Sequence, residues 1–191
     1  MAKEFVIRCP GRPSDRMVAS LVSHLSSFGR LDEPAQLAAQ VWAKYRSAAD
    51  RHTLNRLVQA YLAKEKFDHA VRLVKGMKQF YGVQPESYAC NVIIHAFVTA
   101  RRVDDAQKVL DMMPELAIQP SCITLSSLIA GYAKGGQVEK AKAMIESMES
   151  VWGVRPEIVT HNSIISALCQ GNRVEEALRY LRTIKAPLGV R

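Results

Sequence analysis

Three stretches of the chain place apolar residues on one face of an α-helix. Counting from Leu54, Cys90 and Leu125, apolar residues recur at i, i+3, i+4, i+7 and i+8. The stretch Val159–Leu168 has a similar amphipathic character. The pattern therefore predicts four short helices, each of which buries one face.

A second helical pattern follows each of these stretches after a short polar turn. Apolar residues recur there at i, i+3, i+7 and i+10, counting from Phe67, Val103, Val138 and Val174. An acidic residue comes directly after each starting position, where it suits the positive end of a helix. These acids are Asp68, Asp104, Glu139 and Glu175. The chain is thus predicted to consist of helix pairs joined by tight turns.

Three tracks of residues keep one register along the chain. The second helices share an early small residue, at Ala70, Ala106, Ala141 and Ala177, spaced 36, 35 and 36 apart. The first helices share an early polar residue with the same spacing, at Asn55, Asn91, Ser126 and Asn162. A proline closes the pairs at Pro85, Pro120 and Pro156. A fixed period of this length indicates a repeat array. The alanine track predicts helix crossings too close for a larger side chain.

The array resembles the pentatricopeptide repeat family. The resemblance rests on the early asparagine of the first helix, the second-helix start Gly171-Asn-Arg-Val-Glu-Glu-Ala-Leu178, a late methionine, and the Gly-Val-x-Pro ending at Gly82–Pro85 and Gly153–Pro156. The tetratricopeptide repeat has a similar period, but its Trp-x2-Leu-Gly-x2-Tyr signature does not occur here.

The tracks divide the chain into five repeats after a short arm. Four repeats are expected at 51–86, 87–121, 122–157 and 158–191, the last truncated at its end. A degenerate repeat is expected at 15–50, where Pro34 takes the alanine slot in the first turn of the helix, a position that tolerates proline. Residues 1–14 precede the array as a basic N-terminal arm, or as an ordinary frayed terminus.

The expected fold class is all-α. The resemblance implies a right-handed α-solenoid (superhelix) of stacked helix-turn-helix repeats, in which each repeat packs only on its neighbours. The composition, 48% hydrophobic and 23% charged, is that of an ordinary folded chain. No apolar run approaches the ~18 residues of a membrane span, so no membrane partner is expected.

The last repeat is expected to leave apolar surface uncovered. The chain ends at Gly189-Val190-Arg191, one residue short of the proline that closes the earlier repeats. We therefore expect one open flank on the last helix, at Val174, Leu178 and Leu181. Either further repeats or a partner surface would cover such a flank.

The charge balance favours a polyanionic partner. The chain has 26 Lys and Arg against 18 acids, a net charge of +8. Part of the excess lies in the turns, where stacked repeats would align basic side chains as a stripe that contacts phosphates. These residues are Lys64, Lys66, Arg101, Arg102, Lys134 and Arg173. The alternative is a solvated rim that keeps the protein soluble.

Nothing in the sequence predicts an enzyme. The cysteines (9, 90, 122 and 169) form no metal motif and indicate a reducing compartment. The five histidines are scattered, and there is no phosphate-binding glycine loop or nucleophile elbow. No catalytic residue, metal, cofactor or small-molecule substrate is therefore expected.

The family resemblance implies binding of single-stranded RNA, one base per repeat. The base-reading pairs carried over from the family are Asn55 with Glu86, Asn91 with Ser121, Ser126 with Glu157, and Asn162 with a partner beyond the chain. The residues that sandwich the bases are His52, Tyr88, Ile123 and Val159. The lysine after the first helix, which meets phosphate in the family, is matched best by Lys134.

Some of these residues are better suited to base recognition than others. A short amide or hydroxyl can both donate to and accept from a base edge, and the pair Asn91–Ser121 is of a kind that the family associates with pyrimidines, especially cytosine. Glu86 and Glu157 are unusual partners, because a carboxylate near phosphates weakens binding. Alternatively, the asparagines cap or space the turn.

Three functions remain open at this stage. The first is an RNA-binding protein of an organelle, the mitochondrion or alternatively the chloroplast, acting in RNA stability, processing or translation. The second is a structural subunit of a mitochondrial ribosome that contacts rRNA and neighbouring proteins. The third is a protein-binding helical scaffold without RNA.

Overall fold

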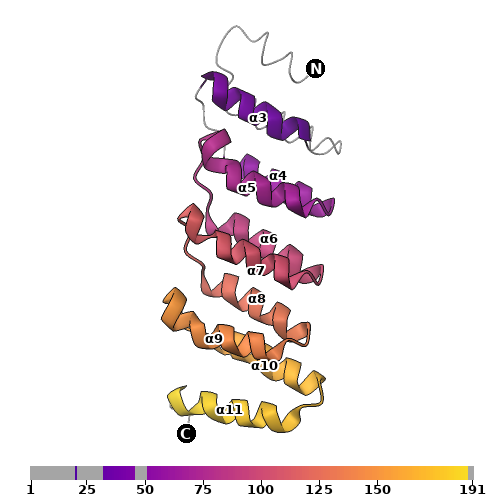
Figure 1. The fold of residues 1–191 in the computed structure, drawn as a ribbon, viewed down its shortest axis with the longest axis vertical. Coiled ribbons are helices and arrows are strands. Elements are labelled where there is room, and N and C mark those ends of the chain that lie inside the picture. Colours follow the sequence, from indigo (N-terminus) through magenta and orange to yellow (C-terminus); the bar gives the residue numbers. More distant parts are fainter. Residues whose placement is uncertain (1–19, 21–31, 46–50, 189–191) are drawn as a thin grey trace. The chain divides into compact units, whose positions relative to one another are not determined.

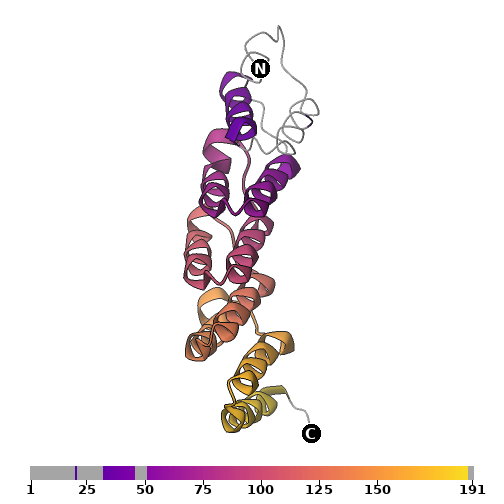
Figure 2. The same ribbon diagram turned by 90° about the vertical axis from the view of Figure 1, so that its right-hand side faces the viewer.

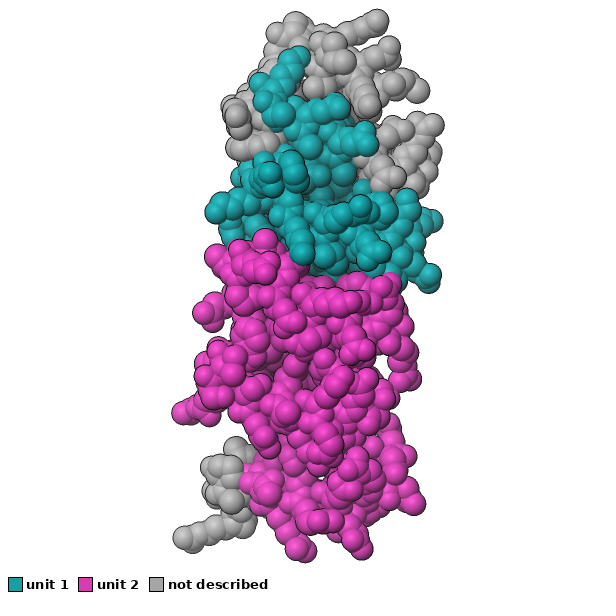
Figure 3. Space-filling view, viewed as in Figure 1, with its two compact units in different colours: residues 1–93 teal, residues 94–191 magenta. Residues whose placement is uncertain are grey.

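The computed structural model describes residue 20, residues 32–45 and residues 51–188. The chain forms two compact units, residues 1–93 (unit 1) and residues 94–191 (unit 2), shown in different colours in Figure 3. The N-terminal arm and the expected first helix of the degenerate repeat lie outside the described residues.

The described part of the chain is built from helices and contains no strand (Figure 1). The helices are α3 (Asp32–Tyr45), α4 (Arg51–Ala63), α5 (Phe67–Tyr81), α6 (Ser87–Thr99), α7 (Val103–Met112), the 3-10 helix η1 (Pro114–Leu116), α8 (Cys122–Lys134), α9 (Val138–Trp152), α10 (Ile158–Gln170) and α11 (Val174–Leu188). The expected all-α fold of helix-turn-helix repeats is confirmed. None of these helices has both the length and the apolar character needed to cross a membrane.

Successive helices pack on one another inside each unit. In unit 1, α5 packs against both α4 and α3. In unit 2, α8 packs against α7, α9 and α10, and α10 packs in turn against α9 and α11 (Figure 2). The first helices α8 and α10 therefore lie side by side, and this contact positions the site described below.

The alanine track is buried in the core, as predicted. Ala70, Ala106 and Ala141 are 0% exposed and Ala177 is 5% exposed. The late methionines of the same helices, Met77, Met113 and Met148, are also fully buried. The apolar faces of the first helices are buried as well: in α8 these are Leu125, Leu128 and Ile129. The helical period thus identified the core correctly.

The segment that closes each helix pair contains a residue in the left-handed backbone conformation, with positive φ. Gly82 and Gly153 end α5 and α9 with φ of 67° and 65°, and their N–H groups donate to carbonyls of the last turn. Glycine is the usual residue there because it has no side chain to clash. In the intervening repeat the same slot holds Ala117, at φ 56°, directly after η1.

Replacing Ala117 with glycine is therefore expected to raise the free energy of unfolding by about 0.5–1 kcal/mol. The relief of the left-handed conformation exceeds the added entropy of the unfolded chain. Chemical denaturation measures the change. Ala143→Gly is the control, because Ala143 is exposed within α9 and glycine there should destabilise the helix by about 1 kcal/mol. A loss of stability in both variants would contradict the prediction.

The turn between the two helices of each pair also contains a residue with positive φ. Its positions are Glu65, Arg101, Gly136 and Asn172, with φ between 56° and 77°. These positions keep the spacing of the other tracks, but the four residues have chemically different side chains. The sequence tracks did not reveal this slot, because the turn geometry is imposed by the two helices that it joins.

The last described helix shows the expected apolar flank. Val174 and Leu178 of α11 are about half exposed, whereas Leu181 is more covered.

Candidate functional site

Unit 2 contains a groove that gathers six of the residues predicted from sequence. Its cavity volume is about 590 Å³, and it is lined by α8, the start of α10 and the end of α6. The predicted residues on its walls are Arg101, Ile123, Ser126, Lys134, Glu157 and Val159. The sequence assigned these residues to three roles, stacking, base reading and phosphate contact, and the structure brings them together.

Two apolar side chains flank the groove. Ile123 and Val159 are 70% and 67% exposed, although both are large and apolar. They occupy the second position of α8 and α10, which pack side by side. Their exposure means that a flat apolar ring placed against them would remove this surface from water, which is favourable.

The polar wall of the groove is more ordered than the sequence suggested. The hydroxyl oxygens of Ser126 and Thr160 lie 2.7 Å apart, and Thr160 is 0% exposed. The Cys122 sulfur lies 3.7 Å from the Ser126 hydroxyl, and its thiol donates to the backbone oxygen of Arg155 at 3.8 Å. Ser126 was predicted as a reader without these supports. Thr160 could have been noticed from its position among apolar residues on the buried face.

The two predicted readers that directly precede α8 and α10 behave differently. Glu157 is the N-cap residue of α10, but its exposed side chain makes no capping hydrogen bond. Ser121 is the N-cap residue of α8, and its hydroxyl accepts from the Thr124 N–H at 3.3 Å. The Thr124 hydroxyl accepts from the Ser121 N–H in return, at 3.1 Å, which completes a capping box. The Ser121 hydroxyl thus already serves the helix.

The basic end of the groove lies where α8 ends. The Arg101 guanidinium donates to the backbone oxygen of Lys134 at 3.0 Å, which places both side chains at the same turn. The Lys134 side chain is exposed and forms no ion pair with a described residue. Two positive charges therefore border the groove at this end.

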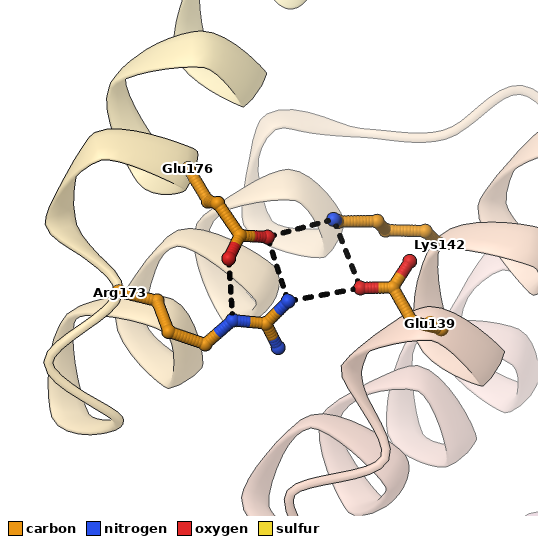
Figure 4. A network of polar contacts seen from close by, with 4 residues as sticks. All are labelled: Glu139, Lys142, Arg173 and Glu176. Atoms are coloured by element: carbon orange, nitrogen blue, oxygen red, sulfur yellow. Dashed lines mark hydrogen bonds and ion pairs between the residues drawn. The ribbon is translucent and has the colours of Figure 1, made fainter.

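The predicted basic stripe is only partly available to an outside anion. Arg173 donates to both carboxylate oxygens of Glu176, at 2.7 and 2.6 Å, and to Glu139 at 3.2 Å (Figure 4). Lys142 completes the network, with its ammonium 3.3 Å from Glu139 and 3.8 Å from Glu176. The hydrogen bond from Arg173 lowers the pKa of Glu176, and those from Lys142 and Arg173 lower the pKa of Glu139.

Arg102 is neutralised in the same way. Its guanidinium lies 2.7 Å from the Asp105 carboxylate and over the ring of Phe97, 5.0 Å from the centroid. Arg102 and Arg173 are therefore already paired with carboxylates, and their contact with phosphate stays a prediction. The physical reason is that the second helices begin with acids, which reach the basic turns beside them.

Unit 1 repeats parts of this pattern. Glu86, a predicted reader, forms an ion pair with Arg51. Tyr88 is exposed, and its hydroxyl accepts from Gln59 at 2.8 Å. The other predicted residues of the unit also lie at the surface or are half-buried: His52, Asn55, Lys64 and Lys66.

The predicted readers Asn91, Ser121 and Asn162 do not line the groove of unit 2. The pair Asn91–Ser121 joins residues of different units, so it stays a prediction. Asn162 is exposed on α10, but it does not line the groove.

Acidic residues are segregated between the two kinds of helix. The four first helices, α4, α6, α8 and α10, contain no aspartate or glutamate. Each of the second helices α5, α7, α9 and α11 contains at least one. A negatively charged polymer lying on the first helices would therefore meet few carboxylates of the described residues: Glu86 and Glu157 at helix starts and Glu65 in a turn.

The described residues show no metal cluster, and their most buried thiol is kept protonated. They contain no cluster of three His, Cys, Asp or Glu side chains that could hold a metal ion. Cys90 is buried, and burial raises the pKa of its thiol to about 11, so it stays protonated.

Two family models match repeats along the chain. The model of the PPR repeat family matches residues 85–134 and 125–170, and the model of the PPR repeat matches residues 52–81 and 159–186. A chloroplastic pentatricopeptide repeat-containing protein of Arabidopsis thaliana is 26% identical over 132 residues, which are 69% of this chain and 26% of the relative. A mitochondrial one is 30% identical over 137 residues, which are 71% of this chain and 33% of the relative. The chain thus spans about a quarter to a third of the length of these relatives.

Solved structures show the same fold. The pentatricopeptide repeat protein PPR10 from maize has a TM-score of 0.72 at 23% identity, over 96% of this chain and 26% of that chain. PPR10 in complex with an 18-nt psaJ RNA element has a TM-score of 0.65 at 22% identity, over 98% and 27%. The nuclear proteinaceous RNase P 2 from A. thaliana has a TM-score of 0.62 at 15% identity, over 91% and 39%. With its repeats matched by family models along most of residues 52–186, the chain belongs to the pentatricopeptide repeat family.

Proposed function

We propose that this chain binds single-stranded RNA on the exposed faces of its first helices. The observation that carries the proposal is the groove of unit 2, which combines apolar flanks, the polar side chains of Ser126 and Glu157, and two cations, Lys134 and Arg101, that form no ion pair with a described residue. A base would lie between Ile123 and Val159, with its edge toward Ser126 and Glu157 and the adjoining phosphate near Lys134 and Arg101. This division of labour matches what single-stranded nucleic acid requires, a ring contact and a positive charge along the backbone.

The charge distribution supports the same surface. Acids are confined to the second helices, the turns and the helix starts, so the exposed faces of the first helices repel a polyanion least. In unit 1 the corresponding side chains are His52 and Tyr88 for stacking, Asn55 for reading, and Lys64 and Lys66 for phosphate. Glu86 fits less well, although its pairing with Arg51 offsets its charge.

The relatives support an organellar role for the protein. One structural neighbour is PPR10 bound to an RNA element, and the relatives carry chloroplastic or mitochondrial names. We therefore propose that the protein acts in a mitochondrion or chloroplast, in RNA stability, processing or translation, and that it has no catalytic activity of its own.

Lys134→Ala should weaken binding to a pool of single-stranded RNA without changing sequence preference. Loss of one phosphate contact should reduce the slope of log affinity against log salt by about 0.7. Filter binding at several salt concentrations measures both quantities. Lys140→Ala is the matched control, because Lys140 lies on α9 and pairs with Asp104 at 3.6 Å. Equal effects of the two substitutions would place the RNA elsewhere.

Other outcomes would select another function. Affinity for RNA that does not depend on salt, or no affinity at all, would favour a protein-binding scaffold. Co-sedimentation of the native protein with mitochondrial ribosomes would favour the role of a structural subunit.

A further inference from the structure

The hydroxyl groups in the wall of the groove form a chain with a fixed direction. Among the described residues, Ser126 is the only hydrogen-bond partner of the Thr160 hydroxyl. Thr160 is 0% exposed, so no solvent can accept its proton. A buried hydroxyl proton without an acceptor is unfavourable. Thr160 must therefore donate to Ser126, and not the reverse.

Because Thr160 donates, the hydroxyl proton of Ser126 remains available for a ligand in the groove. A hydroxyl has one proton, and Ser126 uses its oxygen to accept from Thr160. The other neighbour, the Cys122 sulfur at 3.7 Å, is a weak acceptor, and its own proton is directed to the Arg155 carbonyl. Ser126 is thus presented to a ligand as a hydrogen-bond donor.

Glu157 supplies the complementary group. Its ionised carboxylate can only accept hydrogen bonds, and no capping bond occupies it. It lies one helical turn before Thr160, whose N–H donates to the Glu157 backbone oxygen at 2.9 Å. The groove is therefore lined by one donor and by a carboxylate with two acceptor oxygens.

Guanine has the base edge that matches this arrangement. Its O6 accepts, and its N1–H and N2–H groups are two adjacent donors that a carboxylate can engage together. Uracil offers one donor between two acceptors. In adenine and cytosine a ring nitrogen acceptor adjoins the amino donor and would face the carboxylate with like partial charge.

We propose that the unit 2 groove selects guanine in single-stranded RNA, and that Thr160 is the positioning residue that makes Ser126 a donor to guanine O6. Glu157 accepts from N1–H and N2–H, while Ile123 and Val159 contact the two faces of the ring. The inference rests on the proposed function, because it concerns which base the same groove takes.

Strands with a single base give the direct test. Four single-stranded RNAs are made abasic at every position but one, which carries guanine, adenine, cytosine or uracil. The full chain is expected to bind the guanine strand about tenfold more tightly than the adenine or cytosine strand, as for other well-placed pairs of hydrogen bonds to a base. Glu157→Gln should abolish this preference. Glu175→Gln, the same change at an exposed site of α11, should keep it.

A fifth strand tests the direction of the hydroxyl chain. It carries 6-thioguanine, which keeps both donors but replaces O6 with sulfur, a weak acceptor. The parent should bind it more weakly than guanine, whereas Ser126→Ala should bind the two equally. Thr160→Val should shrink the difference, because the Ser126 hydroxyl is then free to turn, and Thr160→Ser should restore it. Thermal melts confirm that each variant is folded at the assay temperature.

The outcomes separate this inference from the proposed function. If the protein binds a mixed single-stranded RNA pool but not guanine above the other bases, the guanine inference is wrong and RNA binding stands. If Thr160→Val keeps the full 6-thioguanine penalty, Thr160 does not position Ser126. If no RNA binds even at low salt, the proposed function itself fails.

Discussion

Replacing Ala141 with leucine is expected to lower the free energy of unfolding by about 1–3 kcal/mol, the usual cost of overpacking a tight core. Ala141 is 0% exposed on α9, a helix that packs against both α8 and α10. The added carbons have no space to enter, so side chains or backbones must shift. Urea denaturation followed by circular dichroism measures the loss.

Ala143→Leu is the matched control, because Ala143 lies on the same helix but is exposed. Leucine there should change stability by less than about 0.5 kcal/mol, as surface substitutions usually do. An unchanged denaturation midpoint in Ala141→Leu would mean that the register of the alanine track is wrong.

Gly131→Val is expected to have an effect of similar size at the crossing of α6 and α8. A Cβ atom at Gly131 would lie 2.8 and 3.0 Å from the two methyl carbons of Val98. Real Cβ atoms do not approach so closely, so valine at this position forces the helices apart, at a cost of about 1–3 kcal/mol.

The rescue by Val98→Ala makes this second prediction specific. Truncating Val98 removes the two methyl groups that a new Cβ would meet. In the Val98→Ala background, Gly131→Val should therefore lose much less stability than in the parent, as a double-mutant cycle in denaturant measures. An equal loss in both backgrounds would point to helix propensity and not to the crossing.

The buried core could be predicted from the sequence because it follows from patterns within each helix and from their repetition. The period of apolar residues determines which face of a helix is buried, and a repeated small residue marks where two helices cross. Ala70, Ala106, Ala141 and Ala177 satisfied both conditions and are buried. Ile123 and Val159 were assigned instead through the family resemblance, and both are exposed.

The polar details were not readable, because they depend on distances between repeats. Ser126 and Thr160 stand 34 residues apart, and so do Glu139 and Arg173. Nothing in a local pattern says which of many serines meets which threonine, or which arginine a glutamate will neutralise. The sequence therefore did not reveal that Arg102 and Arg173 pair with acids, whereas Lys134 lines the groove and forms no ion pair with a described residue. A Ser-x-x-Thr pattern at Ser121 could have suggested the capping box.

The hydrogen bond between Ser126 and Thr160 limits how freely such repeats can be exchanged. Ser126, the proposed reader in the repeat that begins at residue 122, is hydrogen-bonded to a side chain from the repeat that begins at residue 158. The slot of Thr160 is filled by Ala89 in the repeat that begins at residue 87, so grafting that repeat after Ser126 would remove the supporting hydroxyl. An engineered array assembled from independent repeats would thus change the base preference of the repeat before each junction. The smallest unit that can be transferred unchanged is a repeat together with the third residue of the next repeat.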